Sequence, residues 1–358
     1  MRLLTRYLAR EIYASIALVL TALLMLFAFL DLINELSALG HGSYNLGYVL
    51  LYIALTLPSH IYELFPVAIL IGSILALVQM AANSELTIYR ASGASLQQIV
   101  MALFKITLPL VVISLLCGDV LAPHTKRMAQ SLRLKAQNAE ITLKEFRSGL
   151  WAKDARSFVN AKSVLPDTSM LNVSIYEFDE NHRLQTIVTA KRATFLDENT
   201  WQLEEATQTR FEKQGTTVNK HASLEWRSAL NPDLLGVLLV KPEHMSAWNL
   251  YQYTRHLRDN RQKTERYEIA MWNKLIYPLV AFIMMLLALP FASHQKREGG
   301  ISAKVFAGIV LGLAFHFAGR LSGNLGALNE WNPFLSAMAI PMLFLLLAGA
   351  MLWRTERR

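Results

Sequence analysis

Residues 46–82 read LGYVLLYIALTLPSHIYELFPVAILIGSILALVQMAA, an apolar run in which Glu63 is the one acidic side chain. About 20 such residues cross the hydrocarbon of a bilayer, so this run can span it and continue into the outer interface. Pro58 and Pro66 interrupt the run, and a proline inside a membrane helix removes a backbone hydrogen bond and bends the helix. We therefore expect one long, kinked transmembrane helix.

The rest of the chain contains five more apolar runs of spanning length. They are residues 12–33, 97–121, 270–292, 301–325 and 334–353. The chain is 53% hydrophobic and 17% charged, which is too apolar for an ordinary soluble protein. The first run exceeds the roughly 7–15 apolar residues of a secretory signal. We expect it to remain as the first of six transmembrane helices.

Basic residues at the ends of short loops predict the orientation of these helices. They are Arg2, Arg6, Arg10, Arg90, Lys296, Arg297, Lys304, Arg354, Arg357 and Arg358. All fall on one side of a six-helix arrangement, which the positive-inside rule places in the cytoplasm. Both termini are then cytoplasmic and residues 123–267 lie outside. The net charge of +8 therefore reflects membrane orientation, and we expect no nucleic-acid partner.

Residues 123–267 have a different texture from the spans. Short alternating runs such as Leu171-Asn-Val-Ser-Ile175 and Trp201-Gln-Leu203 are separated by polar, turn-like clusters. This spacing predicts an antiparallel β-sandwich or jelly-roll, with an apolar interior that includes Leu171, Val173 and Ile175. The expected fold is α-helical and membrane-embedded, with an inserted all-β domain. We divide it at 1–121, 122–267 and 268–358.

The chain offers little catalytic chemistry. It contains no GxxxxGK[ST] phosphate loop, no HExxH zinc motif and no GxSxG nucleophile motif, and its nine histidines lack metal-ligand spacing. The single cysteine, Cys117, excludes an internal disulfide. We expect neither an enzyme nor a cofactor nor a metal site.

The cytoplasmic loop after the second span predicts a short helix over 84–93. Ser84 can cap it, Glu85 lies in its first turn and Gly93 can end it. Leu86, Tyr89 and Arg90 share one face by their spacing. Taken alone, the pattern favours a connector whose apolar side rests on the bilayer. Ser95 and Gln98 then form a capping box that starts the third span.

Ionisable groups within apolar spans are costly and point to function. Glu63 can pair with Lys105 or with Lys274, and such a pair can also do no more than fix helix register. His316 and Arg320 fall at the depth of outer-leaflet head groups in the fifth span.

Basic residues also gather outside, where the β domain joins the membrane. Lys126, Arg127, Arg133 and Lys135 follow the third span, and Arg258 and Arg261 precede the fourth. One interpretation is a collar that attracts an anionic, phosphorylated lipid. The other is an ordinary solvated surface, because a long translocated domain is exempt from the positive-inside rule. The residues alone leave both open.

Several short segments, in a specific order, match a known family. They are GHGSY at 40–44, SEL at 84–86, RASG at 90–93, GLWAKD at 149–154, and MWNK at 271–274 followed by Pro278. Over essentially its whole length the sequence resembles the LptF/LptG permease family.

The resemblance implies a specific activity. Members pair an LptF with an LptG subunit, bind a cytoplasmic LptB ATPase dimer, and admit lipopolysaccharide from the outer leaflet with help from the LptC helix. The lipid then passes into a chain of periplasmic β jelly-rolls. The helix at 84–93 would be the coupling helix, with Glu85 as its polar contact with LptB and Leu86 and Tyr89 as packing anchors.

The chain also departs from the family. Members place lysines at the outer end of the first span, whereas this sequence has Asp31 and Glu35 there. Lys274, His316, Arg320 and the collar therefore become the candidate lipid contacts.

Two other classes of protein remain as alternatives. A membrane-anchored periplasmic scaffold or sensor would have no ATPase partner. An ion-driven secondary transporter would show broken helices with midplane binding groups in both halves, and only Glu63 and Lys105 point that way.

Overall fold

The computed structural model of the protein describes residues 2–40, 42–85, 88, 95–136, 141–142, 150–154, 157–165, 169–181, 183–197, 199–212, 215–228, 242–260, 262–293 and 300–356. Its helices are α1 (Arg2–Leu36), α2 (Leu46–Ala82), α4 (Leu96–Leu115), the π-helix η1 (Leu116–Leu121), α5 (Ala122–Ala136), the 3-10 turn η2 (Pro242–His244), α7 (Ala247–Asp259), α8 (Glu265–Ser293), α9 (Ile301–Leu328) and α10 (Pro333–Glu356). Its strands are β1 (Ile141–Thr142), β2 (Leu150–Asp154), β3 (Ser157–Val164), β4 (Met170–Phe178), β5 (Leu184–Asp197), β6 (Thr200–Glu212) and β7 (Gly215–Arg227).

Within these described ranges, six helices are long and apolar enough to cross a membrane, which confirms the predicted helical class. The second span begins and ends where the sequence placed it. Asn45 is the N-cap of α2, and its side-chain oxygen accepts the Tyr48 N–H at 3.2 Å. The capping box of Ser95 and Gln98 also forms at the start of α4. The N-terminal ends of α2 and α4 are thus both fixed by hydrogen bonds from nearby side chains.

The α2 helix lies at the centre of the bundle, and it continues through two internal prolines, Pro58 and Pro66. Pro66 has no N–H to donate to the carbonyl of Tyr62, and the Tyr277 hydroxyl of α8 donates to that carbonyl instead, at 2.6 Å. The rings of Tyr62 and Tyr277 stack at 4.2 Å. The kinked helix is thus held by a neighbouring span.

The third span does not end at residue 121. It passes through the π-helix η1 and continues as α5 to Ala136, well beyond the apolar run. The hydropathy of the sequence marks only the apolar part of this helix, because α5 is polar and carries Lys126, Arg127 and Arg133 of the predicted collar.

The strands form one antiparallel sheet in the order β1-β3-β4-β5-β6-β7, with β2 also paired to β3. The expected all-β insertion is confirmed. The sheet bends along a row that crosses β4 and β6, where Asn172 and Glu205 adopt positive φ values of 48° and 50°. The alternation of buried side chains changes phase there, so Met170 is buried in place of the expected Leu171, while Val173 and Ile175 are buried as expected.

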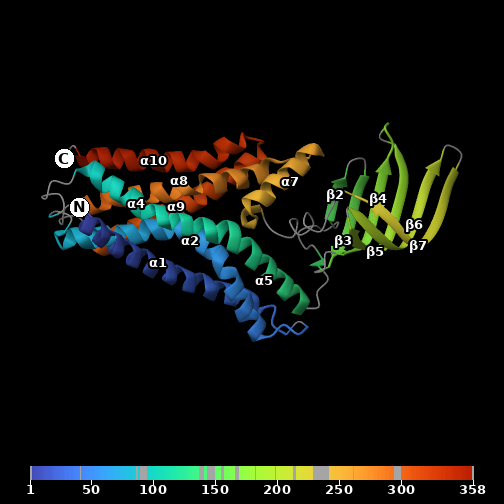
Figure 1. Ribbon diagram of the computed structural model, residues 1–358, viewed down its shortest axis with the longest axis horizontal. Coiled ribbons are helices and arrows are strands. Elements are labelled where there is room, and N and C mark those ends of the chain that lie inside the picture. The colour runs from blue at the N-terminus through green and yellow to red at the C-terminus, as the bar shows by residue number, and fades with distance from the viewer. Residues whose placement is uncertain are drawn as a thin grey trace.

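The bundle and the sheet lie end to end (Figure 1). The start of α1 and the end of α10 lie at one end of the bundle, and the strands lie beyond the other end, with α5 and α7 between. The helix α7 was not predicted within the β region. It packs Leu250, Tyr253 and Leu257 against Ala270 of α8.

Candidate functional site

The structure describes only part of the predicted coupling helix. Leu86, Tyr89, Arg90 and Gly93 lie outside the described residues. Ser84 begins a helical turn by accepting the Ile88 N–H at 3.0 Å, and its φ is 65°. Within the described part of the chain, the buried Oε2 atom of Glu85 has no hydrogen-bond partner, and Tyr7 of α1 lies beside this carboxylate. Glu85 therefore keeps unused acceptor capacity.

Glu35, at the C-terminal end of α1, binds Arg133 within the chain. The Arg133 Nε atom lies 3.2 Å from Glu35 Oε2, and the Tyr44 hydroxyl donates to the same oxygen at 3.1 Å. The Arg133 guanidinium also lies 5.7 Å from the centre of the Tyr52 ring. Burial, followed by the Glu35 charge, raises the pKa of Tyr44, so its hydroxyl stays protonated and donates.

Asp31, one turn earlier, binds α2. His60 Nε2 lies 2.7 Å from Asp31 Oδ2, and the Thr56 hydroxyl donates to that oxygen at 3.3 Å. Lys126 of α5 lies near the same carboxylate. Both Asp31 and Glu35 are thus matched by basic groups of this chain.

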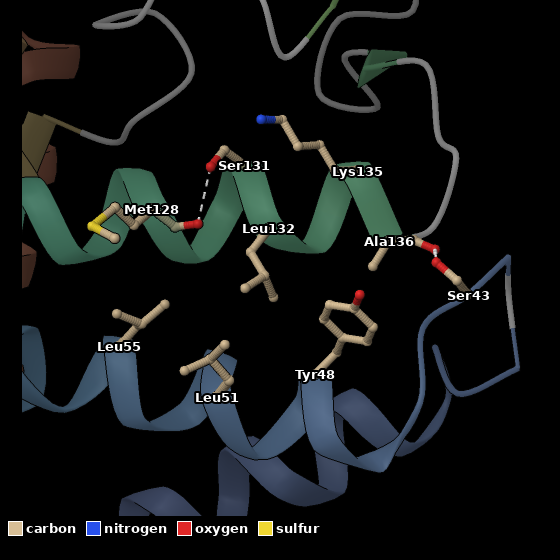
Figure 2. A pocket seen from close by; sticks show the side chains of 9 residues that line it. All are labelled: Ser43, Tyr48, Leu51, Leu55, Met128, Ser131, Leu132, Lys135 and Ala136. Atoms are coloured by element: carbon tan, nitrogen blue, oxygen red, sulfur yellow. Dashed lines mark hydrogen bonds between the residues drawn. The ribbon is translucent and has the colours of Figure 1, made fainter.

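A pocket of about 480 Å³ lies between α2 and α5 (Figure 2). Tyr48, Leu51 and Leu55 point from α2 toward α5, and Leu132 points back toward them. Lys135 is also a lining residue, and its side chain extends from the side of α5 that faces away from α2. The remaining lining residues are Ser43, Met128, Ser131 and Ala136. The sequence showed Lys135 only as part of a basic run, because a pocket between segments far apart in the chain leaves no local signal.

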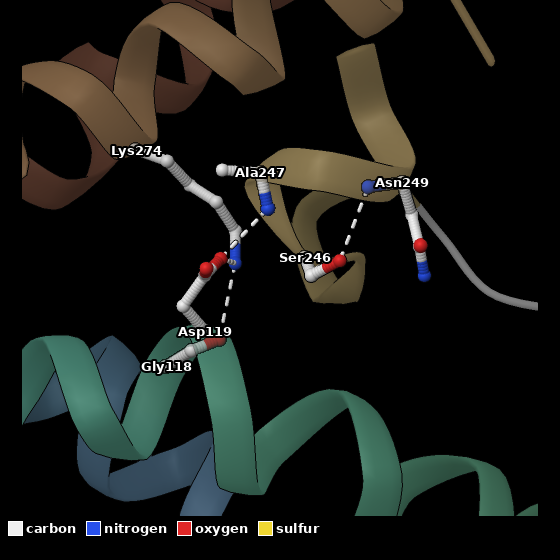
Figure 3. Close-up of polar contacts among 6 residues, drawn as sticks. All are labelled: Gly118, Asp119, Ser246, Ala247, Asn249 and Lys274. Atoms are coloured by element: carbon white, nitrogen blue, oxygen red, sulfur yellow. Dashed lines mark hydrogen bonds and ion pairs between the residues drawn. The ribbon is translucent and has the colours of Figure 1, made fainter. Parts of the chain in front are cut away.

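Lys274 of α8 lies where η1, α7 and α8 meet (Figure 3). Its side chain is only 8% exposed, and its Nζ atom lies 3.3 Å from Asp119 Oδ1 and donates to the Gly118 carbonyl at 3.0 Å. Asp119 Oδ1 also accepts the N–H of Ala247, the first residue of α7, at 2.7 Å. Lys274 therefore already has two polar partners within the chain.

Glu63 pairs with Arg320 of α9, and His316 Nε2 lies 3.9 Å from the same carboxylate. This differs from the predicted pairing with Lys105 or Lys274, because helix order in the bundle places α9 beside α2. The Arg320 side chain stays 63% exposed despite the pair.

The remaining collar residues divide between paired and unpaired groups. Arg258 of α7 pairs with Glu268 of α8 at 2.7 Å, and Arg261 lies outside the described residues. Within the described ranges, Arg127 and Lys135 have no acidic partner within 4 Å. No group of three or more His, Cys, Asp or Glu side chains in the described part of the chain could hold a metal ion.

Comparisons with known proteins agree with this architecture. The family described as "Lipopolysaccharide export system permease LptF/LptG" matches residues 6–354. The chain is 31% identical to the lipopolysaccharide export system permease protein LptG of Haemophilus influenzae, over 98% of this chain and 98% of the relative. It is also 31% identical to LptG of Escherichia coli K12, over 99% of this chain and 98% of the relative.

Both relatives are LptG proteins and both align over nearly the full length, so the match covers the spans and the β sheet alike. With six apolar helices, the chain is a multi-pass protein of the inner membrane. It belongs to the lipopolysaccharide export system permease LptF/LptG family, as a permease of the LptG type.

Proposed function

We propose that this permease withdraws lipopolysaccharide from the outer leaflet of the inner membrane and passes it into its β domain, using ATP hydrolysis by a partner. The observation that carries the proposal is the end-to-end arrangement of bundle and sheet (Figure 1). A lipid that leaves the bilayer along α5 would meet the sheet next.

The orientation in this proposal follows the basic loops. The termini and residues 84–93 face the cytoplasm, and the β domain of 122–267 is periplasmic, between membrane segments 1–121 and 268–358. The sheet lies at the opposite end of the bundle from the two chain ends, which supports this assignment.

Extraction needs work from outside the chain. Burial is worth about 0.8 kcal/mol per methylene, so a chain of about a dozen carbons is held in the bilayer by roughly 10 kcal/mol. The sequence has no phosphate-binding loop with which to use ATP itself. An LptB dimer would supply this work through residues 84–93. The buried Glu85 oxygen, which has no donor among the described residues, supports Glu85 as its polar contact.

The lipid contacts in this proposal differ in their availability. Arg127 and Lys135 would meet a phosphate first, because neither has an acidic partner in the described residues. The pocket between α2 and α5 would take apolar chain beside Lys135, since its volume lies within the range of about 300–1,000 Å³ of known ligand sites.

Other predicted contacts would have to exchange partners. Arg133, Arg258 and Arg320 each have a carboxylate that a phosphate would displace. Lys126, His316, Lys274 and Arg261 complete the proposed set, although the burial of Lys274 favours a structural role.

The partners in this proposal are LptF, the LptB dimer and LptC. In the most apolar 18-residue stretch of α1, only 11% of the residues are buried, and the share in α9 is the same. These two spans therefore offer the largest apolar surfaces for LptF and for the LptC helix.

Co-purification tests the ATPase coupling. Glu85→Ala and Glu85→Arg should lose the nucleotide-binding subunit in mild detergent, whereas Gln97→Ala, an exposed residue at the same end of the bundle, should keep it. A wild-type chain that purifies with LptF but without any ATPase would instead support the scaffold or sensor.

A further inference from the structure

The carboxylate of Asp119 joins three parts of the chain that are distant in sequence. It lies in η1, accepts the N–H of Ala247 in α7 and contacts Lys274 of α8 (Figure 3). These partners are 128 and 155 residues away. Since α7 follows the strands in the chain and leads into α8, this contact lies where the β region returns to the membrane.

The π-helix explains why Lys274 fits here. A π turn shifts backbone hydrogen bonds out of the α register, and the Gly118 carbonyl accepts the Lys274 ammonium. A Cβ at Gly118 would lie 2.0 Å from the Tyr62 ring, so only glycine allows this approach of η1 to α2. The Lys274 Nζ atom also lies 5.4 Å from the centre of the Tyr62 ring.

The two charges of the pair are unequally buried. Lys274 is 8% exposed, whereas the side chain of Asp119 is 42% exposed. If Asp119 turned away, it would reach solvent, and Lys274 would keep the Gly118 carbonyl and the Tyr62 ring. Separation would therefore leave the buried Lys274 ammonium without a counter-ion, which costs free energy and favours the joined state.

The remaining contacts of α7 are less directional. Leu250, Tyr253 and Leu257 pack against Ala270 of α8, and apolar packing alone permits neighbouring registers. The pair of Arg258 and Glu268 adds little to the choice, because the long Arg258 side chain is 70% exposed and can reach Glu268 from several registers.

We propose that Asp119 is a positioning residue that fixes the start of α7, and with it the return of the β domain, at one place on the third and fourth spans. Lys274 orients the carboxylate, and the Ala247 N–H is the group it holds. The inference goes beyond the transport proposal, because it concerns the position of α7 whether or not lipid is moved.

Distance measurements in the full complex test the proposal. With Cys117→Ala as background, spin labels at Tyr251→Cys in α7 and Ile113→Cys in α4 report the position of α7, since both side chains are half exposed. Pulsed EPR should give one dominant distance in the otherwise native chain. Asp119→Leu should lose it, because both the acceptor and the charge are removed.

Two further variants separate the contributions. Asp119→Asn keeps an acceptor for the Ala247 N–H and loses the charge, so we expect an intermediate distribution. Glu268→Gln removes the other acidic contact between α7 and α8 and should leave the dominant distance unchanged.

The same single distance in Asp119→Leu as in Glu268→Gln would overturn the proposal. If Asp119→Leu fails to assemble, the Asn variant decides the matter in the same way. Loss of transport with an unchanged distance would count against this inference and not against the transport function.

Discussion

The α2 and α8 helices differ from α1 and α9 in where their apolar surfaces go. In the most apolar 18-residue stretch of each helix, 83% of the residues are buried in α2 and 61% in α8, compared with 11% in α1 and in α9. All four are apolar enough to span a bilayer. Hydropathy therefore identifies spans but does not tell a core helix from one that faces lipid or a partner.

Glycines on α2 and α9 allow α1 and α9 to pack closely against α2. A Cβ at Gly72 of α2 would lie 2.6 Å from the Cα of Ile16 in α1, and one at Gly308 of α9 would lie 2.6 Å from the Ile74 side chain. Close backbone approach through glycine is a common means of helix association in membranes, where hydrophobic burial gives little preference between protein and lipid.

The largest effect is expected from closing this approach. Gly72→Val should destabilise the chain by about 3 kcal/mol or more, because the clash is with backbone that cannot rotate away. Thermal unfolding in detergent measures the loss. Gly319→Val is the control, since no atom of the described residues lies within 4 Å of a Cβ there. Equal losses in the two variants would show that α1 is not held by this contact.

A smaller effect should come from the polar contact that holds the C-terminal end of α1. Glu35→Ala leaves Arg133 and the Tyr44 hydroxyl without their acceptor, at an expected cost of about 2 kcal/mol. The partial exposure of Arg133 limits the loss. Chemical or thermal unfolding compared with Glu205→Ala, whose pair with Lys191 is exposed, should show the difference.

The exposed face of α9 should matter for assembly and not for the chain's own stability. Leu313→Ala and Phe317→Ala remove side chains that are 48% and 67% exposed, so the free energy of unfolding should change by less than about 0.5 kcal/mol. Recovery of the partner permease in pull-downs should fall. Unchanged recovery combined with lost stability would reverse the contrast between inner and outer helices.

The smallest effect concerns the fully exposed ion pair of Lys263 and Glu330. The hydrogen bond from Lys263 lowers the pKa of Glu330. The contribution of Glu330 to folding stability is therefore fully present above pH 4.5 and is lost as the pH falls through the lowered pKa. The same bond raises the pKa of Lys263. The contribution of Lys263 to folding stability is therefore fully present below pH 10.5 and is lost as the pH rises through the raised pKa. Tm measured against pH should differ slightly between the native chain and Lys263→Gln at neutral pH and converge at both extremes.

The sequence predicted the elements better than their partners. Hydropathy and caps are local, so the limits of α2 and the start of α4 at Ser95 could be predicted. The pairing of Glu63 with Arg320 and of Lys274 with Asp119 depends on which spans become neighbours, and one sequence does not contain that information.

The same limit applies within the β sheet. Strict alternation predicted a buried Leu171, but the positive φ of Asn172 changes the phase, and residue type alone does not predict a bend that crosses several strands. The π turn of η1 and the helix α7 were missed for a related reason, since tertiary contacts stabilise both.

The unbroken helix from Leu96 to Ala136 has a mechanical consequence. It is about 60 Å long, roughly twice the thickness of the hydrocarbon layer, so it connects the two faces of the membrane as one rod. Each residue of an α-helix advances about 1.5 Å and turns about 100°. Relaxing the π turn by one residue would swing α5 by that angle, carrying Arg133 away from Glu35 and turning the wall of the pocket, with little motion below residue 116.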